Sequence, residues 1–167
     1  MERTEIRPCR AEDVTLLDRH LPAPGAPTRH SGRFARQEAG LATYLVAWHD
    51  GLPAGHGLVR WDGCAAPEVR ALLADCPELN GLDVRADLRG RGIGTALVRA
   101  AEELVRERGR TLLGLGVADD NPRAAALYAR LGYEPVTPYT DRWSRTDAEG
   151  RTHHHADSCG FLVRRLG

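Results

Sequence analysis

Arg89-Gly90-Arg91-Gly92-Ile93-Gly94-Thr95 is the stretch that decides the fold, because it joins a strand-forming segment to a long amphipathic one. The residues before it, Leu79–Arg85, favour a strand, and those after it favour a helix. The backbone N–H groups of such a turn gather at the positive end of the helix dipole, and its glycines let a ligand approach closely. The stretch therefore predicts a site for a phosphate or pyrophosphate group.

The segment that follows the turn has the pattern of an amphipathic helix. Its apolar residues recur at spacings 0, 3, 4, 7, 8, 11 and 12, which form one stripe along a helix. These residues are Ile93, Ala96, Leu97, Ala100, Ala101, Leu104 and Val105. The next segment, Thr111–Val117, is typical of a strand buried on both faces. Strand, helix and strand at this spacing predict a right-handed βαβ unit with parallel strands.

Three classes of anion-binding loop compete for the glycine-rich turn. A dinucleotide fingerprint needs a further glycine where Thr95 stands. A Walker loop needs a lysine, and all 23 basic residues of this chain are arginine. The pattern that remains is Arg89-x-x-Gly92-x-Gly94. The competing structural explanation is a turn that needs flexible glycines and binds nothing.

A second helix is predicted after the strand Thr111–Val117. Asp120 or Asn121 can cap its N-terminus, Pro122 suits its first turn and Gly132 suits its end. Its apolar face consists of Ala124, Leu127, Tyr128 and Leu131.

The remaining segments complete an element order of β α α β β β α β α β β. The additional elements are predicted as follows: a strand at Glu5–Cys9, a helix through Leu16, Leu17 and His20, a helix at Arg33–Ala39, a hairpin of Thr43–Trp48 with His56–Trp61, and strands Tyr139–Arg145 and Gly160–Arg165 joined by a polar loop. The order indicates a mixed α/β (α+β) fold.

Composition limits the classes of protein that fit. A length of 167 residues with 42% hydrophobic content suits a single domain over residues 1–167. A formal net charge of zero gives no global attraction to nucleic acid or to an anionic membrane. The N-terminus lacks the apolar core of an export signal, and no apolar run is long enough for a membrane span. We therefore expect a cytoplasmic protein without nucleic-acid or membrane partners.

Neither the four cysteines nor the histidine run has the spacing of a metal site. Cys9, Cys64, Cys76 and Cys159 are far apart and are typical of free thiols in a reducing compartment. Adjacent histidines do not readily face one metal ion, so the run His153 to His155 is interpreted as part of a polar loop. No metal is expected.

Two motifs together resemble the GCN5-related N-acetyltransferase superfamily. The turn matches that family's pyrophosphate motif, [RQ]-x-x-G-x-[GA], and Leu82 and Val84 match its preceding strand. A later motif, N-x-x-A-x-x-[LF]-Y-x-x-x-G-[FY], is matched by Asn121, Ala124, Leu127, Tyr128, Gly132 and Tyr133. The resemblance covers about residues 78 to 134. It implies a twisted sheet of six to seven strands flanked by about four helices.

The resemblance also implies acetyl-CoA as acyl donor and a primary amine of a small molecule or peptide as acceptor. Backbone amides of Arg91, Gly92 and Gly94 are the expected pyrophosphate ligands, and two splayed parallel strands hold the pantetheine arm. The residues expected to bind the donor are Leu82, Asp83, Val84, Arg89, Gly90, Arg91, Gly92, Ile93, Gly94, Thr95, Asn121, Ala124 and Tyr128.

Acetyl transfer needs a held donor, a deprotonated amine, a stabilised oxyanion and a protonated leaving thiolate. By family position, Tyr128 is the candidate general acid and Glu78 the candidate general base, acting through water. The amide of Leu82 or Asp83 is the candidate oxyanion donor, although Asp83 can instead face the acceptor. In structural terms alone, Tyr128 would only pack on its helix face and Glu78 would only be solvated.

Several alternatives stay open from the sequence. A non-catalytic acyl-CoA-binding regulatory module would keep the turn without needing an acid or a base. A mononucleotide-binding domain shares only the turn. The acceptor, the acyl length of the donor and the choice between monomer and homodimer are not encoded in any recognisable motif. The expected function is that of an acetyl-CoA-dependent N-acetyltransferase.

Overall fold

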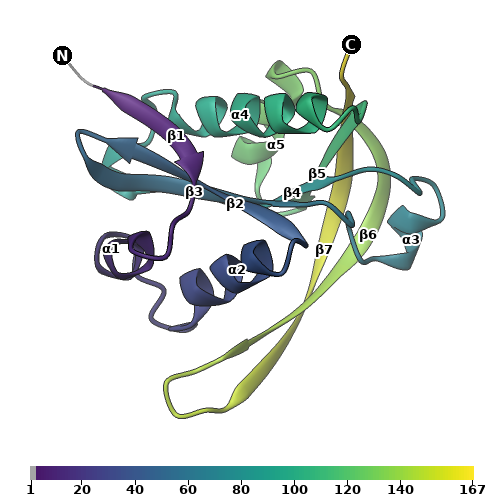
Figure 1. Cartoon of the computed structure of the whole chain (residues 1–167). Helices are drawn as coiled ribbons and strands as arrows, with labels where there is room; N and C mark the ends of the chain where they lie inside the picture. Colours follow the sequence, from purple (N-terminus) through teal and green to yellow (C-terminus); the bar gives the residue numbers. More distant parts are fainter. Residues whose placement is uncertain (1–2) are drawn as a thin grey trace.

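The computed structural model describes residues 3–167 and contains one seven-stranded sheet with helices on both faces (Figure 1). The elements along the chain are β1 (Thr4–Pro8), α1 (Asp13–His20), α2 (Arg29–Glu38), β2 (Ala42–His49), β3 (Leu52–Arg60), α3 (Pro67–Arg70), β4 (Glu78–Val84), the 3-10 turn η1 (Ala86–Leu88), α4 (Ile93–Glu107), β5 (Leu112–Ala118), α5 (Pro122–Arg130), β6 (Glu134–Thr146) and β7 (Thr152–Arg165).

The sheet order is β1-β2-β3-β4-β5-β7-β6, and β4 with β5 is its parallel pair. Among the described residues this pair has one register contact, Glu78 with Gly114, whereas β5 and β7 pair along seven positions from Leu112 to Ala118. The two parallel strands therefore separate after Glu78 and leave backbone groups of both strands without each other as partners. The predicted splay is confirmed.

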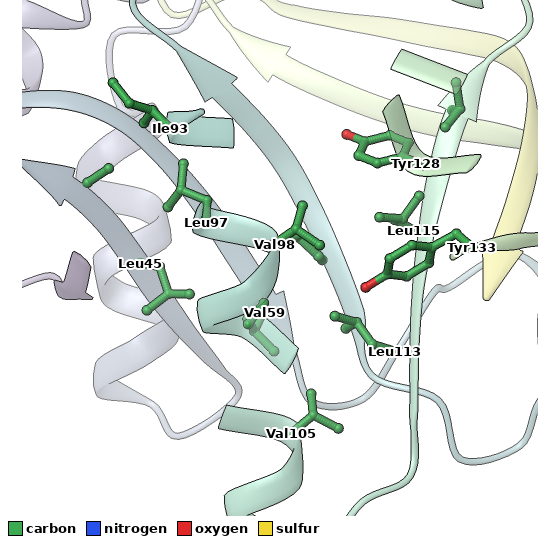
Figure 2. Close-up of a cluster of buried hydrophobic side chains, with 14 of the residues drawn as sticks. Leu45, Val59, Ile93, Leu97, Val98, Val105, Leu113, Leu115, Tyr128 and Tyr133 are labelled. Atoms are coloured by element: carbon green, nitrogen blue, oxygen red, sulfur yellow. The ribbon is translucent and has the colours of Figure 1, made fainter. Parts of the chain in front are cut away.

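Helices α4 and α5 cover one face of the sheet, and α1 and α2 lie on the other (Figure 1). The larger core cluster lies beneath α4, where Ile93, Leu97, Ala101 and Val105 are all buried, as the apolar stripe predicted (Figure 2). A second cluster, centred on Leu17 and Tyr44, joins α1 and α2 to β2. Both faces of the central strands are thus covered.

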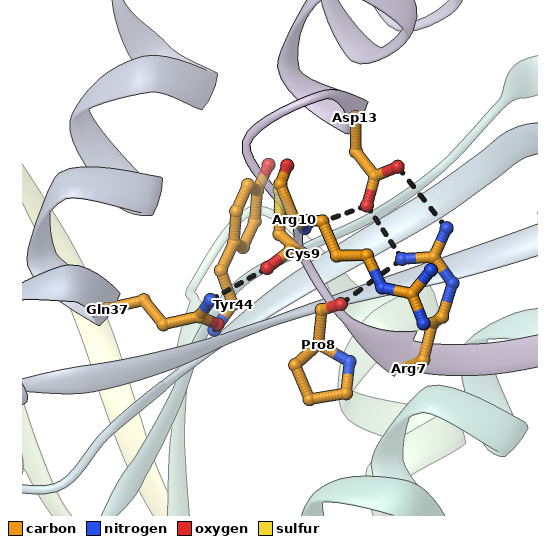
Figure 3. A network of polar contacts seen from close by, with 7 residues as sticks. All are labelled: Arg7, Pro8, Cys9, Arg10, Asp13, Gln37 and Tyr44. Atoms are coloured by element: carbon orange, nitrogen blue, oxygen red, sulfur yellow. Dashed lines mark hydrogen bonds and ion pairs between the residues drawn. The ribbon is translucent and has the colours of Figure 1, made fainter.

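Polar contacts fix α1 and α2 against the sheet (Figure 3). Arg7 in β1 pairs with Asp13 at the start of α1, with 2.7 Å between Nη1 and Oδ2. The Gln37 amide in α2 donates to the Cys9 carbonyl at 2.8 Å, and its oxygen accepts the Tyr44 backbone N–H at 2.8 Å. Because one side chain satisfies a backbone group of the segment after β1 and another of β2, it fixes α2 against the sheet.

The C-terminal hairpin is longer than predicted. β6 begins at Glu134 and β7 at Thr152, and the two pair along their lengths out to Thr146 with Thr152. Pro135 and Pro138 weakened the strand signal, but β6 is an edge strand, where a missing N–H is tolerated. The far half extends past the core, so it lacks the alternating apolar pattern on which strand prediction depends (Figure 1).

The interpretation of His153 to His155 as a loop is therefore wrong, because all three lie in β7. His153 Nε2 is 2.8 Å from Asp147 Oδ2, and the His155 ring stacks on Trp143 with centroids 4.1 Å apart. Within residues 3–167 no group of three or more His, Cys, Asp or Glu is placed to hold a metal ion.

Two helices also differ from their predicted extents. α2 begins at Arg29, four residues before its predicted start, with Thr28 as its N-cap residue. The short α3 was not predicted, since a single turn carries no periodicity. In the part of the chain from residue 3 onward, no helix is long and apolar enough to cross a membrane.

Candidate active site

The glycine-rich turn has the geometry of an anion-binding cradle. Gly92 caps α4 in the left-handed conformation with φ 84°, and Gly90 has φ 80°. A Cβ at either position would meet no atom within 4 Å, so the glycines serve backbone conformation and leave open space in front of the turn. Across residues 3–167, the N–H groups from Gly92 to Thr95 have no backbone acceptor. Unpaired donors at a helix N-terminus favour an anion.

Neighbouring side chains brace this turn. Arg89 Nε donates to the Val84 carbonyl at 3.1 Å, and Arg89 Nη2 lies 3.5 Å from Asp83 Oδ1. Arg85 Nε, at the start of η1, donates to Asp87 Oδ1 within it at 2.7 Å. These contacts tie the turn to the end of β4.

A cavity of about 570 Å³ lies in front of the turn. It is lined by Leu82, Asp83, Val84, Leu88, Arg89, Gly90, Gly92, Ile93, Gly94, Thr95, Asn121, Arg123, Ala124, Leu127, Tyr128 and Arg130. The structure thus brings together all the residues that the sequence assigned to the donor, except that Arg91 lies in the turn and does not line the cavity. Asp83 lines this cavity beside the turn and does not line the larger cavity of the structure. The structure therefore disfavours the alternative in which Asp83 faces the acceptor.

A second cavity, of about 1090 Å³, lies on the other side of the gap between β4 and β5. We call the smaller space the donor cavity and the larger one the acceptor cavity. Both are lined by the same four residues, Leu82, Asn121, Ala124 and Tyr128. The two cavities therefore meet where the parallel strands separate.

Tyr128 stands at this meeting point. Its side chain comes from α5, is 8% exposed and lies beside Leu115 and Tyr133 (Figure 2). Burial raises the pKa of the Tyr128 phenol, and among residues 3–167 its hydroxyl has no hydrogen-bond partner. The phenol therefore stays protonated at neutral pH and is free to donate to a ligand. Asn121 places the helix by accepting the Ala124 N–H at 3.2 Å, as the capping prediction required.

Glu78 lies in the wall of the acceptor cavity and is only 3% exposed. Burial raises the pKa of its carboxyl, although Arg60, with Nη1 3.8 Å from Oε1, and the Asn80 amide at 3.4 Å act against the rise. A buried carboxyl with a raised pKa is suited to accept a proton near neutral pH. The structural reading of Glu78 as a solvated strand-end residue is wrong, because Glu78 is buried where β4 pairs with β5.

Sequence reasoning missed several residues of the acceptor cavity. Asp141 and Tyr139 from β6 face it beside Cys64 and Cys159. Burial raises the pKa of Asp141, and the nearby Asp157 raises it further. No sequence signal marked these residues, because β6 enters the site only through its pairing with β7.

A β-bulge in β4 lies where the two cavities meet. The β3–β4 register shifts between His56 and Leu58, so Gly81 and Leu82 both fall opposite Gly57. Such a bulge redirects the backbone of the strand that carries the extra residue. It occurs next to the position where both cavities meet.

A sheet whose parallel pair opens above an anion-binding turn defines the fold of the N-acetyltransferases. The structure aligns with an N-acetyltransferase from Staphylococcus aureus with a TM-score of 0.72, 15% identity and 99% coverage of both chains. It also aligns with the PaiA N-acetyltransferase from Thermoplasma acidophilum, solved in complex with coenzyme A, with a TM-score of 0.68, 17% identity and coverage of 98% and 99%.

The sequence comparison identifies the family. The model of the acetyltransferase (GNAT) family matches residues 12–133, and the chain belongs to this family. An uncharacterised N-acetyltransferase from Methanocaldococcus jannaschii is 46% identical over 57 residues, which cover 34% of this chain and 25% of that relative. The matched stretch thus spans about a quarter of the curated relative's length.

Proposed function

We propose that this protein transfers an acetyl group from acetyl-CoA to a primary amine by direct attack within a ternary complex. The observation that carries the proposal is the junction of the two cavities at Leu82, Asn121, Ala124 and Tyr128. A donor held by the turn and an acceptor held on the other side would meet there without a covalent enzyme intermediate. Amine-dependent release of CoA is the test.

Binding of the donor falls to the turn and the opened strands. The free N–H groups from Gly92 to Thr95 bind the pyrophosphate, and the separated edges of β4 and β5 hold the amide groups of the pantetheine arm. The bulged Leu82 amide donates to the thioester oxygen as negative charge develops on it.

The remaining side chains move the two protons. Glu78, through a water molecule, takes a proton from the amine as the nitrogen attacks the thioester carbon. The C–N bond forms, the C–S bond breaks, and the Tyr128 phenol gives its proton to the departing thiolate. The products are the N-acetylated amine and CoA.

The four cysteines, all free and buried, support our placing of the protein in a reducing compartment such as the cytoplasm.

Replacing Gly94 tests donor binding separately from catalysis. Its φ is not in the left-handed region, and a Cβ there would meet only Val84, at 3.8 Å, so Gly94→Leu is compatible with the fold. The leucine side chain would fill the cradle. Acetyl-CoA at a hundredfold excess over Kd should stabilise the parent by about 2.7 kcal/mol and leave the variant unshifted.

Gly94→Ala is the matched control, because the family motif accepts alanine at this position. We expect it to keep the thermal shift. Equal stabilisation of the leucine variant by acetyl-CoA would show that the donor binds elsewhere. In the parent, displacement of acetyl-CoA by ATP as readily as by CoA would favour a mononucleotide site.

A further inference from the structure

The acceptor cavity has a wall of arginines on α2. Arg29, Arg33 and Arg36 follow one another at spacings of four and three, so they share one face of the helix, and all three line the cavity. Within residues 3–167 none of them pairs with a carboxylate. The Arg36 Nε is moreover buried without a hydrogen-bond partner. Guanidinium groups that lack a carboxylate partner on a cavity wall can bind an anionic ligand.

The sheet holds Arg33 in place without neutralising it. Its Nη1 donates to His56 Nδ1 at 2.9 Å, and its guanidinium lies 5.7 Å from the centre of the Tyr44 ring. Burial and the nearby Arg33 lower the pKa of His56 well below its ordinary value, so the imidazole is neutral. Gly81, with φ 64°, leaves the room that the guanidinium occupies, since a Cβ there would collide with it.

The same cavity also contains carboxylates that lie on the sheet and not on α2. Glu78 from β4, Asp141 from β6 and Asp157 from β7 all line it. In total, six arginines and four carboxylates line the cavity: Arg29, Arg33, Arg36, Arg60, Arg142 and Arg145, with Glu68, Glu78, Asp141 and Asp157. A polyamine or another purely cationic acceptor would have to lie against unpaired positive charge on α2, which is unfavourable.

We propose that the acceptor is an amine that also carries a carboxylate, which the arginines of α2 bind while the amino group lies toward Glu78. This inference rests on the proposed function and names the acceptor class of the same site. The fork of a guanidinium matches a carboxylate with two parallel hydrogen bonds. Amino acids and short acidic peptides present both groups. Aminoglycosides and polyamines lack the carboxylate.

Matched acceptors test the proposal. β-Alanine, γ-aminobutyrate and L-glutamate are each compared with the corresponding carboxamide, at saturating acetyl-CoA, by CoA release. We expect kcat/KM to be about tenfold or more higher for the best carboxylate than for its amide, since a hydrogen bond to a charged group is lost in the amide. Equal rates within each pair would overturn the proposal.

Variants assign the preference to α2. Arg33→Gln and Arg36→Gln should each reduce the carboxylate-to-amide ratio, whereas Arg19→Gln on α1, an exposed arginine outside the cavity, should keep it. Arg36→Gln keeps the contacts of Arg33 with His56, so a folding defect in one variant does not decide the result. A weaker Kd for acetyl-CoA with an unchanged ratio would mean that these arginines bind the donor, and would contradict the proposal.

Calorimetric titration of the CoA-loaded protein with the same pairs separates this inference from the proposed function. Preferential binding of the carboxylates without turnover would support carboxylate binding by the arginines of α2 and would count against acetyl transfer. Turnover of amines with no preference for the carboxylates would support acetyl transfer and contradict carboxylate binding by the arginines of α2.

Discussion

Tyr128→Phe is expected to lower kcat by about 10²-fold while leaving the affinity for acetyl-CoA nearly unchanged. The substitution removes one oxygen and keeps the ring, so packing beside Leu115 and Tyr133 should survive. The leaving thiolate then has to take its proton from water. Steady-state kinetics at saturating acetyl-CoA and acceptor, with a binding titration of the donor, measure both quantities.

The pH profile adds a second readout for Tyr128. Burial raises the pKa of this phenol, and the acid must be protonated to act, so the parent should lose kcat only as pH rises through the raised pKa. The alkaline limb should disappear in the phenylalanine variant. Full kcat with unchanged pH dependence would mean that Tyr128 only packs.

Tyr133→Phe is the matched control for the removal of a buried phenol oxygen. Tyr133 donates to Glu102 Oε2 at 2.8 Å and lines neither cavity. We expect this variant to lose stability, because one partner of a buried carboxylate is removed, and to retain kcat.

Glu78→Gln is expected to lower kcat/KM by about 10²- to 10⁴-fold, because the amide cannot accept the proton of the attacking amine. In the parent, activity should rise as pH increases through the raised pKa of Glu78, and this acidic limb should disappear in the variant. Glu68→Gln, an exposed carboxylate in the same cavity, is the control and should keep the limb.

Stability should move in the opposite direction to activity. The folded-state pKa of Glu78 lies above its unfolded value, so the folded state binds more protons between the two values. Stability is therefore lost as pH rises through the folded pKa, and Glu78→Gln should be the more stable protein above it. A variant with lower Tm at pH 8 and full activity would show that Glu78 is structural.

The donor cavity could be predicted from the sequence because its signals are local. The glycines around Gly92, the stripe that starts at Ile93 and the cap at Asn121 each express a backbone requirement within a few residues. Their order along the chain then fixed which strands are parallel. The resemblance added the proposed role of Tyr128, which packing alone would not have indicated.

The acceptor cavity could not be predicted in the same way, because long-range pairing creates it. Glu78 is buried by its position opposite Gly114, and Asp141 reaches the site through the pairing of β6 with β7. Arg33 acquires its place from the room above Gly81, 48 residues further along the chain. None of these relations leaves a periodic pattern in the sequence.

The most direct test of the central claim is amine-dependent release of CoA, measured with the mass of the acceptor. The protein is incubated with acetyl-CoA and with each member of a panel of amino acids, peptides, polyamines and aminoglycosides. We predict release only when a suitable amine is present, one acetyl group on that amine for each CoA released, no acetylated protein, and no release by Gly94→Leu. Tight binding of acetyl-CoA with no amine-dependent release from any acceptor would contradict the account and identify a binding module.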